Sequence, residues 1–162
     1  MIVLIIVIVG LILCFGGGLL VGAPYVPTLY PQVEAALDLA KLQSGETLLE
    51  LGCGDGRVLL AAAERGIHAV GYELNPLLAL IAWLRTRRYR GHVQIICGNF
   101  WRAKWPPAEA VFVFLLDRYM VKLDTKLDQY PHKPLKLVSF AFQIPDKQPD
   151  SEKAGVFLYR YK

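Results

Sequence analysis

The stretch Thr47-Leu-Leu-Glu-Leu-Gly-Cys-Gly-Asp-Gly-Arg57 decides how this 162-residue chain is expected to fold. Its first five residues form the short, mostly apolar run that is typical of a buried strand, and glycines follow at alternate positions. Residues 58–65 are rich in alanine and leucine and are followed by Gly66, a residue type that often terminates a helix. We therefore predict a strand, a glycine turn and a helix, in that order.

The rest of the chain continues the alternation of strands and helices. Short apolar runs predict further strands at residues 68–73, 92–97, 110–116, 136–142 and 156–161. Helical spacing of apolar residues, with proline and glycine as start and stop signals, predicts helices at residues 32–42, 58–65, 77–88 and 120–127. This order is typical of an α/β fold with a Rossmann-like, doubly wound and mainly parallel sheet.

The N-terminal segment differs from the rest in composition. Residues 1–22 carry no charged side chain, and the first charge in the chain is Glu34. Such a run is long enough to cross the hydrocarbon layer, about 30 Å thick, as one transmembrane helix. A signal peptide would show a positively charged start and a shorter apolar core. We predict a transmembrane anchor at residues 1–22 that binds the lipid bilayer, a linker with a helix at 23–46, and one catalytic domain at 47–162.

The net charge of +4 is modest, and the basic residues concentrate in one place. Four arginines lie close together in the chain: Arg85, Arg87, Arg88 and Arg90. They form either a patch for anionic lipid or nucleic acid, or the solvated end of a helix, where cations are favoured.

The cysteines indicate neither a disulfide framework nor a metal site. Cys14, Cys53 and Cys97 are odd in number and lack the close Cys or His spacing of a zinc site, so no metal is expected. Cys53 lies inside the glycine turn, where a small side chain suits packing better than nucleophilic chemistry.

The glycine spacing favours one class of cofactor. In a parallel sheet the ligand lies beyond the carboxyl ends of the strands, and Gly52, Gly54 and Gly56 allow close backbone approach there. A dinucleotide fingerprint would require glycine where Arg57 stands. The observed spacing, with Glu50 before it, suits S-adenosylmethionine, which has no pyrophosphate to hold.

Two later strand ends complete the expected site. Glu73 lies about twenty residues beyond the turn, where an acidic side chain can accept hydrogen bonds from both ribose hydroxyls. Its alternative role is to cap the helix that Asn75 and Pro76 open. Asn99, at the end of the third strand, is placed to meet the adenine amino group, with Phe100 or Trp101 against the ring face. The alternative for the aromatic residues is plain core packing.

The segments Glu50–Arg57 and Gly71–Pro76 resemble the class I, seven-stranded S-adenosylmethionine-dependent methyltransferases. With Pro24-Tyr-Val-Pro-Thr28, the chain more closely resembles the small membrane-anchored lysine methyltransferases, whose mitochondrial members modify the adenine nucleotide translocase and the ATP synthase c subunit. The resemblance implies a protein-lysine N-methyltransferase that acts on a membrane protein. The anchor at residues 1–22 predicts a single-pass membrane location. Because S-adenosylmethionine is kept in the cytosol and in organelle matrices, we expect the domain to face the cytoplasm, or the matrix if the protein is mitochondrial.

The resemblance also assigns residues. It implies that Glu50, Gly52, Gly54 and Glu73 bind the cofactor, and that the segment Tyr25–Thr28, with Thr28 as a cofactor-binding residue, folds over the site. The chain departs from the family pattern in two places. Asn99 stands where such enzymes often carry aspartate, and Leu116-Asp117-Arg118 lacks the Asn/Asp-Pro-Pro-aromatic motif of adenine or glutamine methyltransferases. The second departure argues against nucleobase N-methylation, and no nucleic-acid partner is expected.

Three questions stay open at this point. The acceptor is either a lysine or, since the same motifs serve both, a small molecule or lipid. A non-catalytic membrane module that binds S-adenosylmethionine is a further alternative. For the group that accepts the lysine proton, topology offers Asp117 and Tyr119, which follow the fourth strand.

Overall fold

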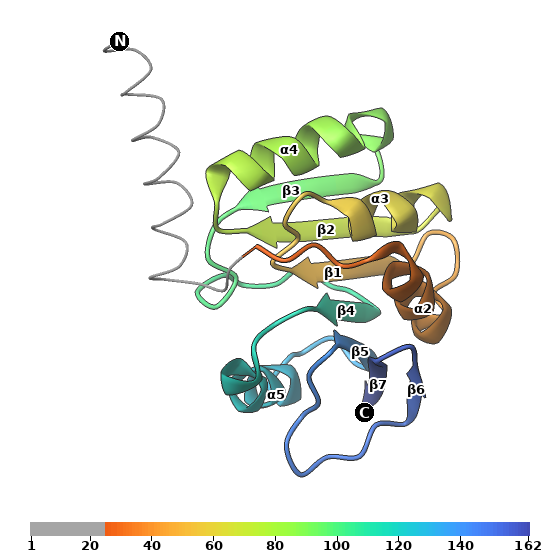
Figure 1. Cartoon of the computed structure of the whole chain (residues 1–162), viewed down its shortest axis with the longest axis vertical. Coiled ribbons are helices and arrows are strands. Elements are labelled where there is room, and N and C mark those ends of the chain that lie inside the picture. Colours follow the sequence, from red (N-terminus) through yellow and green to blue (C-terminus); the bar gives the residue numbers. More distant parts are fainter. Residues whose placement is uncertain (1–24) are drawn as a thin grey trace.

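The computed structural model describes residues 25–162, which fold around one sheet (Figure 1). The strands follow the spatial order β3-β2-β1-β4-β5-β7-β6. Their bounds are Thr47–Leu51 for β1, His68–Glu73 for β2, Val93–Cys97 for β3, Ala110–Val113 for β4, Leu135–Phe140 for β5, Ser151–Lys153 for β6 and Val156–Tyr161 for β7. The helices are α2 at Tyr30–Ala40, α3 at Arg57–Glu64, α4 at Pro76–Thr86 and α5 at Met120–Asp128, with 3-10 turns η1 at Arg87–Tyr89 and η2 at Asp117–Tyr119.

The sheet is mainly parallel, as predicted. Strands β1 to β5 pair in parallel, whereas β7 pairs antiparallel with both β5 and β6. The chain builds β1, β2 and β3 outward and then returns to place β4 on the other side of β1. The strand order therefore reverses between β1 and β4, and ligands bind beyond the carboxyl ends of the strands at such a point.

Helices cover both faces of the sheet. Successive strand residues point to opposite faces, so Leu48 and Phe112 belong to the core beneath α2, α3 and α4, whereas Leu49 and Val111 belong to the core beneath α5. All four side chains are almost fully buried. The strands are apolar on both faces because helices cover both sides of the sheet.

Gly71 allows β2 and the first glycine turn to pack closely. A Cβ atom added at Gly71 would collide with the Leu59 side chain and would lie 2.8 Å from the Cys53 Sγ atom. Burial raises the pKa of the Cys53 thiol far above its ordinary value. Cys53 is therefore a small buried packing residue and not an activated nucleophile.

The predicted boundaries were wrong in several places. The fourth strand ends at Val113 instead of 116, and the side chain of the next residue, Phe114, packs on Phe140 with ring centroids 4.5 Å apart. The fifth strand ends at Phe140 because Ala141 has a positive φ of 69°. Strand β6 was not predicted, because all three of its residues are exposed and give no apolar alternation. The first described helix begins and ends two residues earlier than predicted, because Lys41, the residue after its last residue Ala40, has a left-handed backbone conformation.

The predicted transmembrane anchor at residues 1–22 lies outside the described residues. Within residues 25–162, no helix combines the length and the apolar character that crossing a membrane requires.

Candidate functional site

The glycine turn after β1 is joined to the end of β2 by a carboxylate. Gly52 and Gly54 have φ angles of 88° and 52°, which side-chain-bearing residues rarely adopt. This conformation directs the Gly54 N–H toward Glu73, whose Oε2 accepts it at 2.8 Å. The other carboxylate oxygen, Oε1, accepts the Asn75 N–H at 2.8 Å. Glu73 therefore has a fixed orientation before any ligand binds.

Asn75, and not Glu73, caps helix α4. The Asn75 side-chain oxygen accepts hydrogen bonds from the backbone N–H groups of Leu77 and Leu78, at 2.9 and 3.3 Å. Such bonds satisfy N–H groups that have no partner inside the helix. The capping role considered for Glu73 is thus filled by its neighbour, and Glu73 holds the backbone of Asn75.

Glu50 is a buried acid beneath the glycine turn. Its residue is 4% exposed, and its Oε2 atom has no hydrogen-bond partner within the described part of the chain. Burial, followed by the negative charges of Asp55 and Glu73, raises the pKa of Glu50 well above its ordinary value. A buried acid with an unused oxygen is costly to the fold and marks a candidate ligand site.

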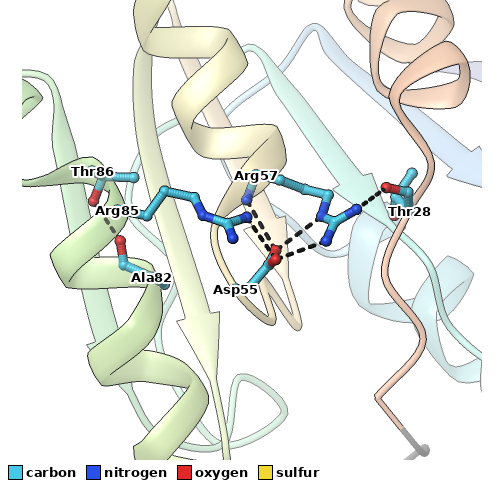
Figure 2. A network of polar contacts seen from close by, with 6 residues as sticks. All are labelled: Thr28, Asp55, Arg57, Ala82, Arg85 and Thr86. Atoms are coloured by element: carbon cyan, nitrogen blue, oxygen red, sulfur yellow. Dashed lines mark hydrogen bonds and ion pairs between the residues drawn. The ribbon is translucent and has the colours of Figure 1, made fainter.

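Asp55 joins two helices through two arginines (Figure 2). Arg57 at the start of α3 donates to Asp55 from Nε at 3.0 Å and from Nη2 at 2.8 Å, and Arg85 on α4 donates at 2.6 Å. Burial acts to raise the pKa of Asp55, but the hydrogen bonds from Arg57 and Tyr25 and the charges of both arginines outweigh it and lower the pKa to about 2.

The segment before α2 lies across this network. Arg57 donates from Nη1 to the Thr28 carbonyl at 3.0 Å (Figure 2), and Thr28 is 6% exposed. The Tyr25 ring lies over the turn, since a Cβ atom added at Gly54 would be 2.8 Å from it. The structure thus places residues 25–28 beside the glycine turn, where the resemblance expected them.

The loop after β3 brings aromatic residues to the same edge of the sheet. The Gly98 N–H donates to the Glu73 carbonyl at 2.8 Å, and the Asn99 side chain accepts from the Trp101 N–H at 2.9 Å. The Trp101 ring lies 4.7 Å from the Phe100 ring and 5.9 Å from the Tyr119 ring, between centroids.

Of the two proton-acceptor candidates, Tyr119 joins this aromatic group. Asp117, by contrast, is exposed.

Sequence reasoning missed the part of the site that Asp55 organises. Asp55 and Arg57 lie inside the quoted motif, where their alternation with glycine was a signal that could have been used. Arg85 was considered only as a member of a surface cluster. Its partner is 30 residues away in the chain, and no local pattern predicts that contact.

These residues fit S-adenosylmethionine better than a phosphate-bearing cofactor. Among residues 25–162, no atom would lie within 4 Å of a Cβ added at Gly52, so this part of the chain leaves the backbone there open to a ligand. Glu50 and Glu73 lie beside the turn together with Asp55, whose charge is paired with Arg57 and Arg85. Glu50 and Glu73 would repel a pyrophosphate but suit hydroxyl groups and an ammonium group. Within residues 25–162 no cluster of His, Cys, Asp or Glu side chains has the arrangement of a metal site.

The chain matches a known methyltransferase family. The model of the ANTKMT methyltransferase domain family matches residues 50–151. The human lysine N-methyltransferase of the ATP synthase c subunit is 30% identical, with the alignment covering 78% of this chain and 55% of that protein. The mouse adenine nucleotide translocase lysine N-methyltransferase is 35% identical, covering 78% and 56%. The chain spans about half the length of these curated relatives.

A solved structure gives the cofactor. An RNA methyltransferase from Salinibacter ruber, in complex with S-adenosyl-L-homocysteine, is 30% identical with a TM-score of 0.76, covering 84% of this chain and 92% of that one. S-adenosylhomocysteine is what remains of S-adenosylmethionine after methyl transfer, and this relative and the methyltransferase family match together support S-adenosylmethionine as the cofactor. The family match covers more than half of the chain and includes both acidic strand ends, and the protein therefore belongs to the family of the ANTKMT methyltransferase domain.

Proposed function

We propose that this protein is an S-adenosylmethionine-dependent protein-lysine N-methyltransferase that acts on a membrane protein. The observation that carries the proposal is Glu50, a buried carboxylate beneath the glycine turn, one of whose oxygens has no hydrogen-bond partner among residues 25–162. The cofactor has a positively charged amino group, which would relieve the cost of that buried negative charge.

Each residue around the turn has a proposed role in holding the cofactor. Glu73 accepts hydrogen bonds from the ribose hydroxyls, because each of its oxygens has lone-pair capacity beyond its one backbone donor. Gly52, Gly54 and Gly56 keep the turn open. Asn99 and Phe100 border the adenine ring, and Thr28 closes the site from the side of the N-terminal segment.

The cofactor supplies an electrophilic methyl group on a sulfonium, so the protein needs only to position the acceptor and exclude water. A lysine must lose its proton first, from a reference pKa of about 10.4, and a desolvated site lowers that pKa. Tyr119 is our preferred proton-accepting group, since it lies half-buried against Trp101, whereas Asp117 is exposed.

The nature of the acceptor rests on relatives and on composition. The two curated relatives above are named for lysines of the ATP synthase c subunit and the adenine nucleotide translocase. The uncharged residues 1–22 support anchoring in a bilayer, followed by the linker and helix of 23–46 and the domain of 47–162. S-adenosylmethionine is available in the cytosol or the matrix, so the domain faces that side.

The test is methyl transfer by the full chain in bilayer nanodiscs, using labelled S-adenosylmethionine with membrane protein, lipid and RNA fractions. We expect label in membrane protein, recovered as methyllysine after hydrolysis, and loss of transfer in Glu73→Ala but not in Glu64→Ala. Glu64 is an exposed acid on α3 and serves as the matched control.

Each other result has a definite meaning. Label confined to lipid would contradict the lysine proposal, and so would label confined to RNA, the acceptor for which the Salinibacter methyltransferase is named. Binding of S-adenosylmethionine in titration calorimetry without any methyl transfer would favour the non-catalytic module that binds the cofactor. The absence of any heat of binding would mean that the nucleoside-binding fold serves only as a scaffold.

A further inference from the structure

Helix α4 carries large apolar side chains on its outer surface. Leu80 is 52% exposed, Trp83 44% and Leu84 45%. Their spacing of three and four residues puts them on one face of the helix. A different face of α4, which includes residues 78, 79 and 82, is buried in the protein. The exposed apolar face is therefore not the face that packs in the core. Surface helices of this kind normally present polar residues to water.

The outer face continues into a cluster of cations. Arg87 and Arg88 follow Leu80 by seven and eight residues and are exposed. The Arg90 guanidinium lies 5.2 Å from the centroid of the Trp83 ring. In the part of the chain that the structure describes, none of these three arginines forms an ion pair, whereas Arg85 pairs with Asp55. The four-arginine cluster therefore divides into one site residue and three surface cations.

We propose that this outer face of α4 lies on an anionic lipid bilayer. Leucine and tryptophan gain free energy by leaving water for the boundary between headgroups and acyl chains, and tryptophan is favoured at that depth. The three arginines complement lipid phosphates. A nucleic-acid backbone would satisfy the arginines but would not desolvate three large apolar side chains, so lipid accounts for both halves of the surface.

The position of α4 gives the contact a consequence. The helix begins at Pro76, three residues after Glu73, and therefore starts at the edge of the sheet that carries the site. Docking of α4 would hold that edge beside the membrane surface. The same contact would form whatever the methyl acceptor is.

The experiment measures the depth of Trp83, because residues 1–22 by themselves are expected to retain the chain on vesicles. The full chain is reconstituted in vesicles of brominated phosphatidylcholine with or without 30% phosphatidylserine, a composition on the order of an anionic leaflet. We expect brominated chains to quench tryptophan fluorescence only in the anionic vesicles. The quenching should disappear in Trp83→Phe and persist in Trp101→Phe.

A charge variant and a matched control test the arginines. The triple variant Arg87→Gln, Arg88→Gln and Arg90→Gln should lose the quenching, with about a fivefold loss in the docking equilibrium for each arginine. The control removes three exposed lysines from the part of the chain that contains β5, β6 and β7, and it should retain the quenching; these are Lys133, Lys153 and Lys162.

Two results would overturn the proposal. Quenching that survives in Trp83→Phe or in the triple arginine variant would place the lipid contact elsewhere. A Trp83 that neither brominated lipid nor aqueous iodide can quench would mean that another segment or a second copy of the chain covers the helix.

Discussion

Glu73 and Gly54, 19 residues apart in the chain, are joined by a hydrogen bond of 2.8 Å from the Gly54 N–H to the Glu73 Oε2 atom. This bond ties the carboxyl end of β2 to the glycine turn after β1. Since the Oε1 atom is held by the Asn75 N–H, the carboxylate cannot turn away from the crevice. The acid that is proposed to hold the ribose is thus oriented by the fold itself, which lowers the ordering cost of binding.

Replacing Glu73 by glutamine should weaken both the fold and cofactor binding. An amide can accept on one side only, so its NH2 group would face the N–H of Gly54 or of Asn75. We expect a loss of about 1–3 kcal/mol in the free energy of unfolding, measured with urea. Affinity for S-adenosylmethionine, measured by calorimetry, should fall about 10- to 100-fold. Glu64→Gln should change neither quantity. If Glu73→Gln and Glu64→Gln bound S-adenosylmethionine with equal affinity, Glu73 would not be a cofactor-binding residue.

Replacing Glu50 by glutamine should stabilise the fold and weaken cofactor binding. The pKa of Glu50 is raised in the folded state, so its contribution to stability is present below its ordinary value of 4.5 and is lost as the pH rises. At pH 7 the variant should therefore be more stable than wild type, by about 1–3 kcal/mol.

The comparison is made by urea unfolding between pH 4 and pH 8, a range set by that ordinary pKa. The extra stability of Glu50→Gln over wild type should become smaller as the pH is lowered. The affinity of the variant for S-adenosylmethionine should be lower than that of wild type. A less stable Glu50→Gln protein at pH 7 would show that the carboxylate has a structural partner.

Asp55 gives the opposite pH dependence. Its pKa is lowered from 3.8 to about 2, so it stabilises the fold above pH 3.8 and loses that effect as the pH falls toward 2. Asp55→Asn leaves Arg57 and Arg85 without their common partner, and we expect a loss on the order of 2 kcal/mol at pH 7. Hydrogen exchange of residues 25–29 should increase in the variant.

The stability difference between wild type and Asp55→Asn should shrink over this acid range. The exposed Asp128→Asn serves as the control. A difference that is constant between pH 6 and pH 2 would mean that Asp55 acts through packing and not through its charge.

Gly71 should tolerate no side chain, although we propose no role for Gly71 in cofactor binding. Gly71→Ala introduces a Cβ atom into the space of the Leu59 and Cys53 side chains. We expect thermal unfolding to show a loss of about 1–3 kcal/mol. Gly91→Ala, where nothing lies within 4 Å of the added Cβ, should stay within about 0.5 kcal/mol of wild type. Equal effects at the two positions would contradict the packing argument.

Local signals in the sequence were sufficient for most of the fold. The apolar runs at β1 and β4 are buried on both faces, so hydrophobicity and strand position coincide. Strand β6 has no buried residue and is held by its pairing with β7 and by the ion pair of Lys153 with Asp38 on α2, neither of which a local pattern reveals. The strand end at Val113 was missed because the apolar residues after it continue in the core outside the sheet.

The sequence by itself determined the cofactor class, because glycine spacing and the acids at Glu50 and Glu73 are local chemical facts. The tertiary structure alone decided how those parts meet. Two contacts join residues that are distant in the chain: Arg85 pairs with Asp55, and Tyr25 lies against the glycine turn. The tertiary structure also gives neighbouring arginines different roles, since Arg85 belongs to the site whereas Arg87, Arg88 and Arg90 lie on the surface. The reason is physical: local patterns fix which residues form a strand or helix, whereas packing of the completed sheet fixes which side chains come within a few ångströms of one another.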